Sequence, residues 1–208
     1  MKIIKTWVRK FVLEHYHFTL EKMDKDFFSS ADNQILYQLV KSVHSLEGDM
    51  AELGVYQGES AKFILEAERE KTLHLFDTWK GLPEVSENDS PVLYKGQFYK
   101  ENLLENTKKY LTEYKNVRFY EGLFPETAGE VEDKKFAFVH LDADLYLSML
   151  SGLKFFYSRM SRGGIIAIHD YYATEGSEGI KMAVDEFLKN KPEVLIQVFR
   201  NRVIIVKQ

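Results

Sequence analysis

The chain has 208 residues, a net charge of −4, 45% hydrophobic residues and no cysteine. This length and ordinary composition predict one soluble globular domain with a sizeable core. The absence of cysteine excludes disulfides, thiolate metal sites and a cysteine nucleophile, and the acidic balance argues against a nucleic-acid-binding surface.

No stretch of the sequence is apolar over the length that a membrane span requires. The N-terminus also lacks the apolar segment and small-residue cleavage site of a signal peptide. We therefore expect a cytoplasmic protein without a membrane span.

Residues 1–28 predict a helical extension whose hydrophobic residues share one face and whose basic residues lie elsewhere. Such a helix packs on its own domain or on a second copy, which favours a homo-oligomer, or it lies in a membrane interface. A second helix is predicted over residues 33–46. We treat residues 1–47 as an N-terminal helical extension and residues 48–208 as the core of a single domain, 1–208.

Strand and helix signals alternate after the extension. Strands are expected over residues 50–55, 72–76, 117–120, 136–142 and 163–170, followed by a hairpin over residues 194–199 and 203–206. Helices are expected over residues 61–69, 99–114 and 179–188, and a further one runs through residues 150–160, with Ser60 as an N-cap of the first and Gly163 closing the helix through residues 150–160. This alternation predicts a Rossmann-like, doubly wound, mainly parallel α/β sheet of seven strands, with the hairpin as an antiparallel edge.

Two predicted strands end in polar side chains. The apolar run over residues 136–139 leads to Asp142, and the run over residues 163–168 leads to His169 and Asp170. Because parallel α/β sheets bind ligands at the carboxyl ends of their strands, these three side chains are expected to meet in one crevice. We interpret this crevice as a cation site. Asp144 is more simply explained as a helix N-cap, and His140 as a buried core histidine.

The segment Glu52-Leu53-Gly54-Val55-Tyr56-Gln57-Gly58 lies where the first strand turns into its helix. Its glycine spacing differs from the dinucleotide fingerprint and is similar to the nucleoside-binding turn of S-adenosylmethionine-dependent methyltransferases. The glycines could equally serve the geometry of the turn alone. Asp77, at the end of the second strand, is placed to accept both hydroxyls of a ribose, although an ordinary loop aspartate is the alternative. Gly122, after the third strand, would lie beside the adenine.

Several strings together resemble the macrocin O-methyltransferase family. They are Glu52-Leu53-Gly54-Val55, Gly58-Glu59-Ser60-Ala61, Phe76-Asp77-Thr78-Trp79-Lys80-Gly81-Leu82-Pro83-Glu84, His140-Leu141-Asp142-Ala143-Asp144-Leu145-Tyr146 and His169-Asp170-Tyr171. The resemblance implies a class I methyltransferase fold, S-adenosylmethionine as cofactor, and a divalent ion, usually Mg²⁺. It also implies a sugar or glycoside hydroxyl as the methyl acceptor. The cofactor residues carried over by position are Glu52, Gly54, Tyr56, Gly58, Ser60, Asp77, Thr78, Gly122 and Asp142.

One position departs from the family pattern, which has Asp-Asp-Tyr where this chain has His169-Asp170-Tyr171. Asp142, His169 and Asp170 would be the metal ligands, and Asp142 and His169 the candidate catalytic residues. Imidazole suits transition metals better than Mg²⁺, so Mn²⁺ or another ion is also consistent with the sequence. A metal-independent methyltransferase with His169 as base, and a non-catalytic module on the same fold, are the alternatives.

Residues 80–97 contain two prolines, two glycines and several acids, which predicts a long loop. A loop of this length beside a predicted site is expected to act as a lid that excludes water.

Overall fold

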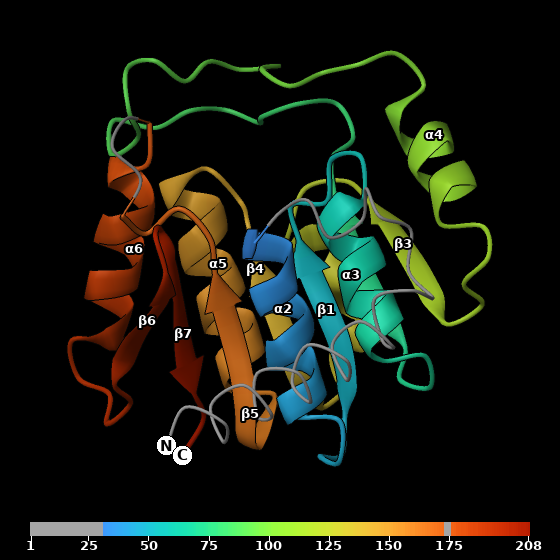
Figure 1. The fold of residues 1–208 in the computed structure, drawn as a ribbon. Coiled ribbons are helices and arrows are strands. Elements are labelled where there is room, and N and C mark those ends of the chain that lie inside the picture. Colours follow the sequence, from blue (N-terminus) through green and yellow to red (C-terminus); the bar gives the residue numbers. More distant parts are fainter. Residues whose placement is uncertain (1–30, 173–175) are drawn as a thin grey trace, which may run out of the picture.

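The computed structural model describes residues 31–172 and 176–208, so the helical extension predicted over residues 1–28 lies outside the described residues. The described chain contains a seven-stranded sheet in the order β3-β2-β1-β4-β5-β7-β6 (Figure 1). Its strands are β1 (Asp49–Leu53), β2 (Leu73–Asp77), β3 (Val117–Glu121), β4 (Phe136–Leu141), β5 (Met160–Ile168), β6 (Leu195–Phe199) and β7 (Arg202–Val206). Its helices are α2 (Ala31–Ser42), α3 (Glu59–Ala67), α4 (Leu103–Tyr110), the 3₁₀ helix η1 (Glu126–Val131), α5 (Tyr146–Tyr157) and α6 (Glu178–Leu188).

The predicted fold class is confirmed. Strands β1 to β5 pair in parallel, and β7 pairs antiparallel with both β5 and β6. The order reverses beside β1, which has β2 on one side and β4 on the other. Open α/β sheets bind their ligands at such a reversal, outside the carboxyl ends of the strands.

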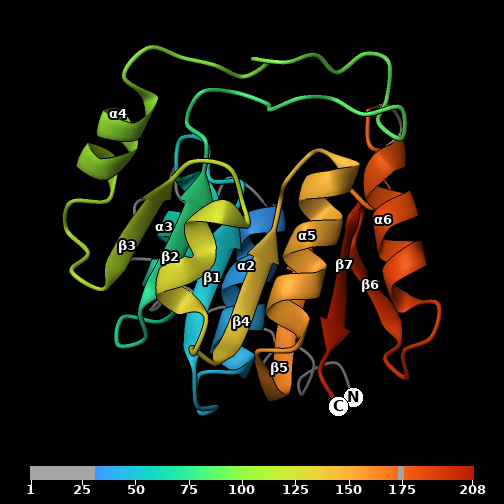
Figure 2. The same cartoon turned by 180° about the vertical axis from the view of Figure 1, so that it is seen from behind.

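Helices cover both faces of the sheet. Residues of α2, α3 and α4 pack in one core cluster, and residues of η1, α5 and α6 pack in the other (Figure 2). All six residues of β4 are buried, because this central strand is covered on both sides. The apolar run over residues 136–139 of β4 is typical of that position, and His140 is the polar residue of the strand.

The register aligns the strand ends. Leu53 of β1 lies opposite Phe76 of β2 and Leu141 of β4, and Leu141 lies opposite Ile168 of β5. The residues that follow these strand positions therefore form one row across the sheet. That row contains Gly54, Asp77, Asp142 and His169.

Several predicted boundaries are wrong. Ser60 is the second residue of α3 and its N-cap is Gly58, because the chain enters the helix through a left-handed residue with φ of 84°. Met160 starts β5 and Gly163 lies within that strand, so Gly163 does not close the preceding helix. The helix predicted over residues 99–114 is reduced to Leu103–Tyr110, since Asn102 has the left-handed φ of 56°. No helix among the described residues is long and apolar enough to cross a membrane.

Candidate active site

The Asp77 carboxylate organises the turn after β1. Its Oδ2 accepts hydrogen bonds from the backbone N–H groups of Val55 and Tyr56, at 2.7 and 2.8 Å. Its Oδ1 accepts a third from the N–H of Trp79, at 2.7 Å. A carboxylate can accept about four hydrogen bonds, so backbone N–H groups occupy most of the acceptor positions of Asp77.

The two glycines of the turn are required by packing. A Cβ atom at Gly54 would lie 1.9 Å from the carbonyl oxygen of Asp142, and one at Gly58 would lie 3.0 Å from the Thr107 methyl group. Both residues also have a positive φ, which glycine adopts at little cost. The glycines therefore let β1 approach β4 and let α3 approach α4. The geometry of the turn accounts for both glycines, and Gly54 also lines the cavity.

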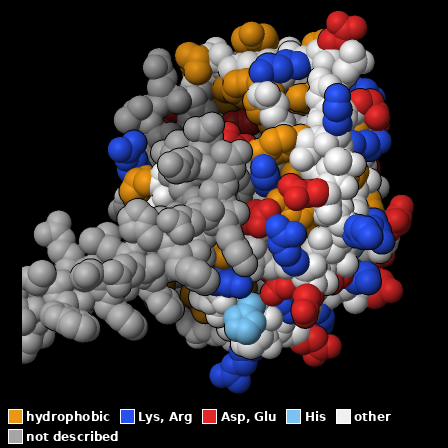
Figure 3. Space-filling view, turned by 45° about the vertical axis from the view of Figure 1, so that its right-hand side comes forward, with side chains coloured by type: hydrophobic (Ala, Val, Ile, Leu, Met, Phe, Trp, Pro, Cys, Tyr) orange, Lys and Arg blue, Asp and Glu red, His pale blue; other side chains and the backbone are white. Residues whose placement is uncertain are grey.

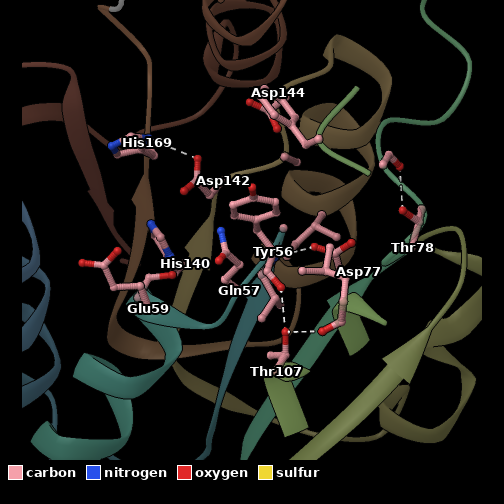
Figure 4. A pocket seen from close by; sticks show the side chains of 18 of the residues that line it. Tyr56, Gln57, Glu59, Asp77, Thr78, Thr107, His140, Asp142, Asp144 and His169 are labelled. Carbon is pink, nitrogen blue, oxygen red and sulfur yellow. Dashed lines mark hydrogen bonds and ion pairs between the residues drawn. The ribbon is translucent and has the colours of Figure 1, made fainter. Parts of the chain in front are cut away.

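Tyr56 is held at the centre of the turn. Its carbonyl oxygen accepts hydrogen bonds from Trp79 Nε1 at 3.2 Å and Thr107 Oγ1 at 2.9 Å. Its ring makes an edge contact with Phe98 and lies under the Lys100 ammonium group, 4.9 Å from the ring centroid. Figure 4 shows the ring between the side chains of Asp142 and Asp77 in that view. The segment after the long loop thus contacts the turn directly.

Asp142, His169 and Asp170 meet at the ends of β4 and β5. His169 Nδ1 lies 3.1 Å from Asp142 Oδ1 and 3.1 Å from Asp170 Oδ2. One possible ligand atom from each of the three residues lies within 4.8 Å of the other two. Among the described residues Nδ1 is nevertheless a buried atom without a hydrogen-bond partner, so neither close approach has hydrogen-bond geometry. Figure 4 shows Asp142 and His169 facing each other across the strand ends.

This arrangement fits a metal ion. Neighbouring ligand atoms around an octahedral ion lie about 1.4 bond lengths apart, or ~3.0 Å for bonds of ~2.1 Å. The separations of 3.1 Å around Nδ1 agree with that spacing. Carboxylates suit Mg²⁺ and Mn²⁺, and imidazole suits transition metals, so this mixed set of ligands fits a divalent ion.

The three carboxylates around His169 control its charge. Burial by itself would lower the pKa of His169, but Asp142, Asp170 and Asp32 raise it to about 12. Burial would likewise raise the pKa of Asp142, and His169 holds it below the usual range instead. Without an ion the imidazole is therefore cationic at neutral pH and balances part of the surrounding negative charge.

Distant parts of the chain support these ligands. His169 Nε2 lies 3.1 Å from Asp32 Oδ2 of α2, and Arg202 of β7 donates to both oxygens of Asp32. Asn201, in the turn before β7, donates to Asp170. Asp32 and Arg202 were not identified from the sequence. Arg202 was assigned only to a polar hairpin turn, and an aspartate at the start of a helix carries no functional signal of its own.

The prediction that Asp144 is the N-cap of the helix after β4 is wrong, and Asp89 takes that place. Asp144 is not an N-cap, because α5 begins after Leu145 without a side-chain cap from within its own segment. The N–H of Tyr146 in the first turn instead donates to Asp89 Oδ1 of the long loop, at 2.6 Å. Asp144 lies in the cavity, where burial first and then Asp142 and Asp170 raise its pKa to about 7. His140 is a buried, hydrogen-bonded histidine as expected, between Glu52 and Arg202.

The strand ends border one cavity of about 1060 Å³. Sites for small molecules and cofactors typically have about 300–1,000 Å³, so this space can hold a nucleoside cofactor and an acceptor together. The sequence-assigned residues that line it are Gly54, Tyr56, Ser60, Asp77, Thr78, Gly122, Asp142, His169 and Asp170. Glu52 is fully buried against His140, and Gly58 faces α4, so these two act behind the cavity wall. Gln57 also lines the cavity and was not assigned from the sequence.

The long loop crosses the top of the sheet. It runs from β2 to α6 and returns to α4 (Figures 1 and 2). Its two ends are joined by hydrogen bonds from Leu82 N to the Gln97 oxygen and from Gly96 N to the Leu82 oxygen, at 2.9 and 2.8 Å. Its middle is tied to α5 through Asp89, and a Cβ atom at Gly179 of α6 would lie 2.7 Å from that carboxylate. The loop is therefore attached at two places: where its two ends meet, and at its middle beside α5.

Comparison with known proteins finds a matching family and several relatives. A family model described as Macrocin-O-methyltransferase (TylF) matches residues 19–198. Mycinamicin III 3''-O-methyltransferase of Micromonospora griseorubida is 28% identical over 140 residues, which are 60% of this chain and 55% of that protein. Demethyldecarbamoylnovobiocin O-methyltransferase of Streptomyces niveus is 28% identical over 158 residues, 69% of this chain and 59% of that protein. The chain therefore spans less than two thirds of the length of these relatives.

A solved structure gives the same result for the fold. The O-methyltransferase NovP matches with a TM-score of 0.68 and 26% identity, over 85% of this chain and 79% of that one.

Proposed function

The chain belongs to the macrocin O-methyltransferase family, and on this premise we propose that it methylates a hydroxyl group of a sugar, glycoside or similar polyol. The proposed methyl donor is S-adenosylmethionine, and the proposed activator is a divalent metal ion. One observation carries the proposal: the ligand atoms of Asp142, His169 and Asp170 converge in the same cavity as the turn at Gly54 and Asp77.

The cofactor would bind along the turn after β1. Asp77 retains one acceptor position after its three backbone hydrogen bonds, and Gln57 beside it offers an amide to the same part of the cavity. Tyr56 and Phe98 provide aromatic surface next to these polar groups. Ser60, Thr78 and Gly122 line the remaining wall, where the nucleoside would lie. The roles of Glu52 and Gly58 would be indirect, through the shape of the turn.

The acceptor hydroxyl must lose its proton to become a nucleophile. A divalent ion on Asp142, His169 and Asp170 would supply this activation, as an ion lowers the pKa of bound water from about 15.7 to about 7. Asp142 is the candidate base because its carboxylate remains ionised beside His169. His169 is less suited to that role, since three carboxylates hold its own proton.

The segment between β2 and α4 contributes apolar surface to the cavity, which suits an acceptor with an apolar part. Leu82, Pro83 and Phe98 of this segment line the cavity, and Val92, Tyr94 and Tyr99 are exposed along the same segment. Figure 3 shows hydrophobic side chains gathered along the upper edge of the molecule, where this segment runs in Figure 1. Aromatic side chains commonly provide binding surface for partly apolar ligands. The names of both relatives refer to O-methylation, of mycinamicin III in one and of demethyldecarbamoylnovobiocin in the other.

Calorimetry and an activity assay test the proposal. We expect S-adenosylmethionine to bind and methyl transfer to a panel of rhamnosides and related glycosides to stop on addition of EDTA. Absence of cofactor binding at millimolar concentration would contradict the proposal. Activity that survives EDTA but is lost in His169→Ala would instead support the metal-independent alternative with His169 as base.

A further inference from the structure

Asp32 lines the same cavity as the proposed metal ligands and contacts His169 among them. Its Oδ2 lies 3.1 Å from His169 Nε2, on the side of the ring opposite to Asp142 and Asp170. Arg202 donates to Asp32 Oδ1 through Nε at 3.0 Å and to Oδ2 through Nη2 at 2.8 Å. Such a paired contact fixes both the position and the negative charge of the carboxylate.

Arg202 is itself held in place inside the protein. Only 2% of its surface is exposed, and its Nη1 lies 2.7 Å from His140 Nε2. His140 Nδ1 lies 2.7 Å from Glu52 Oε1, and both of these residues are fully buried. Because a guanidinium group only donates, His140 Nε2 accepts from Arg202 and His140 Nδ1 donates to Glu52. The buried row Glu52–His140–Arg202 ends at the partly exposed Asp32 and holds that carboxylate against His169.

The contact with Asp32 decides which nitrogen of His169 faces the cavity as an acceptor. A carboxylate held ionised by arginine accepts hydrogen bonds, so Nε2 of His169 carries a proton and donates to it. In the neutral imidazole the lone pair is then on Nδ1, which lies 3.1 Å from both Asp142 and Asp170. Three lone-pair donors that face one another in this way can hold a metal ion between them once Nδ1 has lost its proton. Histidine ligands in metalloproteins are oriented by a carboxylate in the same manner.

We propose that Asp32, clamped by Arg202, is a positioning residue that presents His169 Nδ1 as a nitrogen ligand and makes the site select Mn²⁺ or another first-row transition ion over Mg²⁺. This inference rests on the proposed function only for the existence of the metal site. Its physical basis is that imidazole is a better ligand for transition metals than for Mg²⁺, whose ligands are oxygens. Asp32 contributes by removing the alternative tautomer, in which Nδ1 would carry the proton.

Binding of Mn²⁺ to the metal-stripped full chain tests the proposal without any turnover. Electron paramagnetic resonance of free Mn²⁺ gives the affinity, and competition gives the affinity for Mg²⁺. Pulsed resonance detects coupling from a nitrogen that is bound to Mn²⁺. For the unsubstituted protein we expect Mn²⁺ to bind at least about tenfold more tightly than Mg²⁺, with a clear nitrogen coupling.

Substitutions test whether Asp32 positions His169 for metal binding or only stabilises the fold. Asp32→Asn should weaken Mn²⁺ binding about 10–100-fold, with a smaller effect on Mg²⁺. His169→Asp should abolish the nitrogen coupling and remove the preference for Mn²⁺. In the His169→Asp background, Asp32→Asn should no longer change the ratio of the two affinities, because Asp32 acts through the imidazole. Asp32→Glu retains a carboxylate and should recover part of the Mn²⁺ affinity if Asp32→Asn proves unstable.

The chain supplies a matched control far from the cavity. Asp49 lies 3.1 Å from His74 Nε2, the same separation as between Asp32 and His169. Asp49→Asn removes a histidine–aspartate pair of the same kind and should leave Mn²⁺ binding unchanged.

Three results would overturn the proposal. They are bound Mn²⁺ without nitrogen coupling, equal affinities for Mn²⁺ and Mg²⁺, or an Asp32→Asn effect that is the same with and without His169. Failure to bind any divalent ion would overturn both this inference and the metal part of the proposed function. Selective Mn²⁺ binding without methyl transfer would overturn the proposed function alone.

Discussion

The two regions that border the cavity use their charged groups differently. At the turn after β1, the Asp77 carboxylate accepts hydrogen bonds from neighbouring backbone N–H groups. At the ends of β4 and β5, the charged side chains contact residues from both ends of the described chain. Asp77 accepts three hydrogen bonds from residues of its own turn and the adjacent one. His169 is surrounded by three carboxylates and retains a buried nitrogen without a hydrogen-bond partner among the described residues. The first arrangement stabilises the fold, and the second keeps charge available for a ligand at a cost in stability.

Replacement of Gly54 should have the largest effect, because this residue joins the two regions. In Gly54→Ala the new Cβ atom would lie 1.9 Å from the carbonyl oxygen of Asp142. Overpacking and the positive φ together should lower the free energy of unfolding by about 3 kcal/mol or more. Gly129→Ala is the control, since its Cβ atom meets nothing within 4 Å. Urea denaturation of both variants makes the comparison, and equal stabilities would contradict the packing role of Gly54.

Asp77→Asn tests the structural role of the turn. The amide retains one acceptor oxygen, so at least one backbone N–H of Val55, Tyr56 or Trp79 loses its partner. We expect the free energy of unfolding to fall by about 1–3 kcal/mol. Asp133→Asn, at an exposed position, should change it by less than about 0.5 kcal/mol. A variant Asp77→Asn that keeps its stability and loses only cofactor binding would contradict the structural role of Asp77.

Asp142→Asn is the matching change at the other region. It should reduce divalent-ion affinity by at least about tenfold, since a charged ligand is replaced by a neutral amide. Its effect on unfolding should be smaller than that of Asp77→Asn, because Asp170 and Asp32 still neutralise His169. Ion binding and denaturation, measured on the same preparation, distinguish the two regions. A larger loss of stability in Asp142→Asn than in Asp77→Asn would contradict the different roles of the two regions.

A substitution in the loop across the cavity should have a smaller effect on stability. Asp89→Ala removes the acceptor for the Tyr146 N–H at the start of α5, which should cost about 1 kcal/mol, as for a lost helix cap. The loop should also be cut faster in limited proteolysis, because its middle loses this attachment. Glu87→Ala, an exposed change in the same loop, is the control. Protection of the wild-type loop by S-adenosylmethionine would support its proposed action as a lid.

His74 is a reference for a buried histidine with a single carboxylate. Burial lowers its pKa, despite the contact with Asp49. The folded protein therefore binds fewer protons at His74 than the unfolded chain does, so the stability it contributes is present above the ordinary histidine pKa and is lost as pH falls below that value. Wild type should lose stability between pH 7 and 5 relative to His74→Gln. A difference that does not change with pH would contradict this expectation.

Periodicity and local chemistry determined the fold class, the buried state of His140, and the position of Asp77, Asp142 and Asp170 at or within two residues of a strand end. These features depend on neighbouring residues, so the sequence records them directly. Helix limits were less accurate, because Gly58 and Asn102 adopt left-handed conformations that are set by packing.

Only the tertiary structure revealed the supports of the site. Asp32 and Arg202 are separated by 170 positions in the chain and meet because β7 inserts antiparallel beside β5. The Cβ contact that requires glycine at position 54 likewise comes from β4, not from the turn itself. Contacts of this kind are set by how elements pack together, and a single sequence carries no local pattern for them.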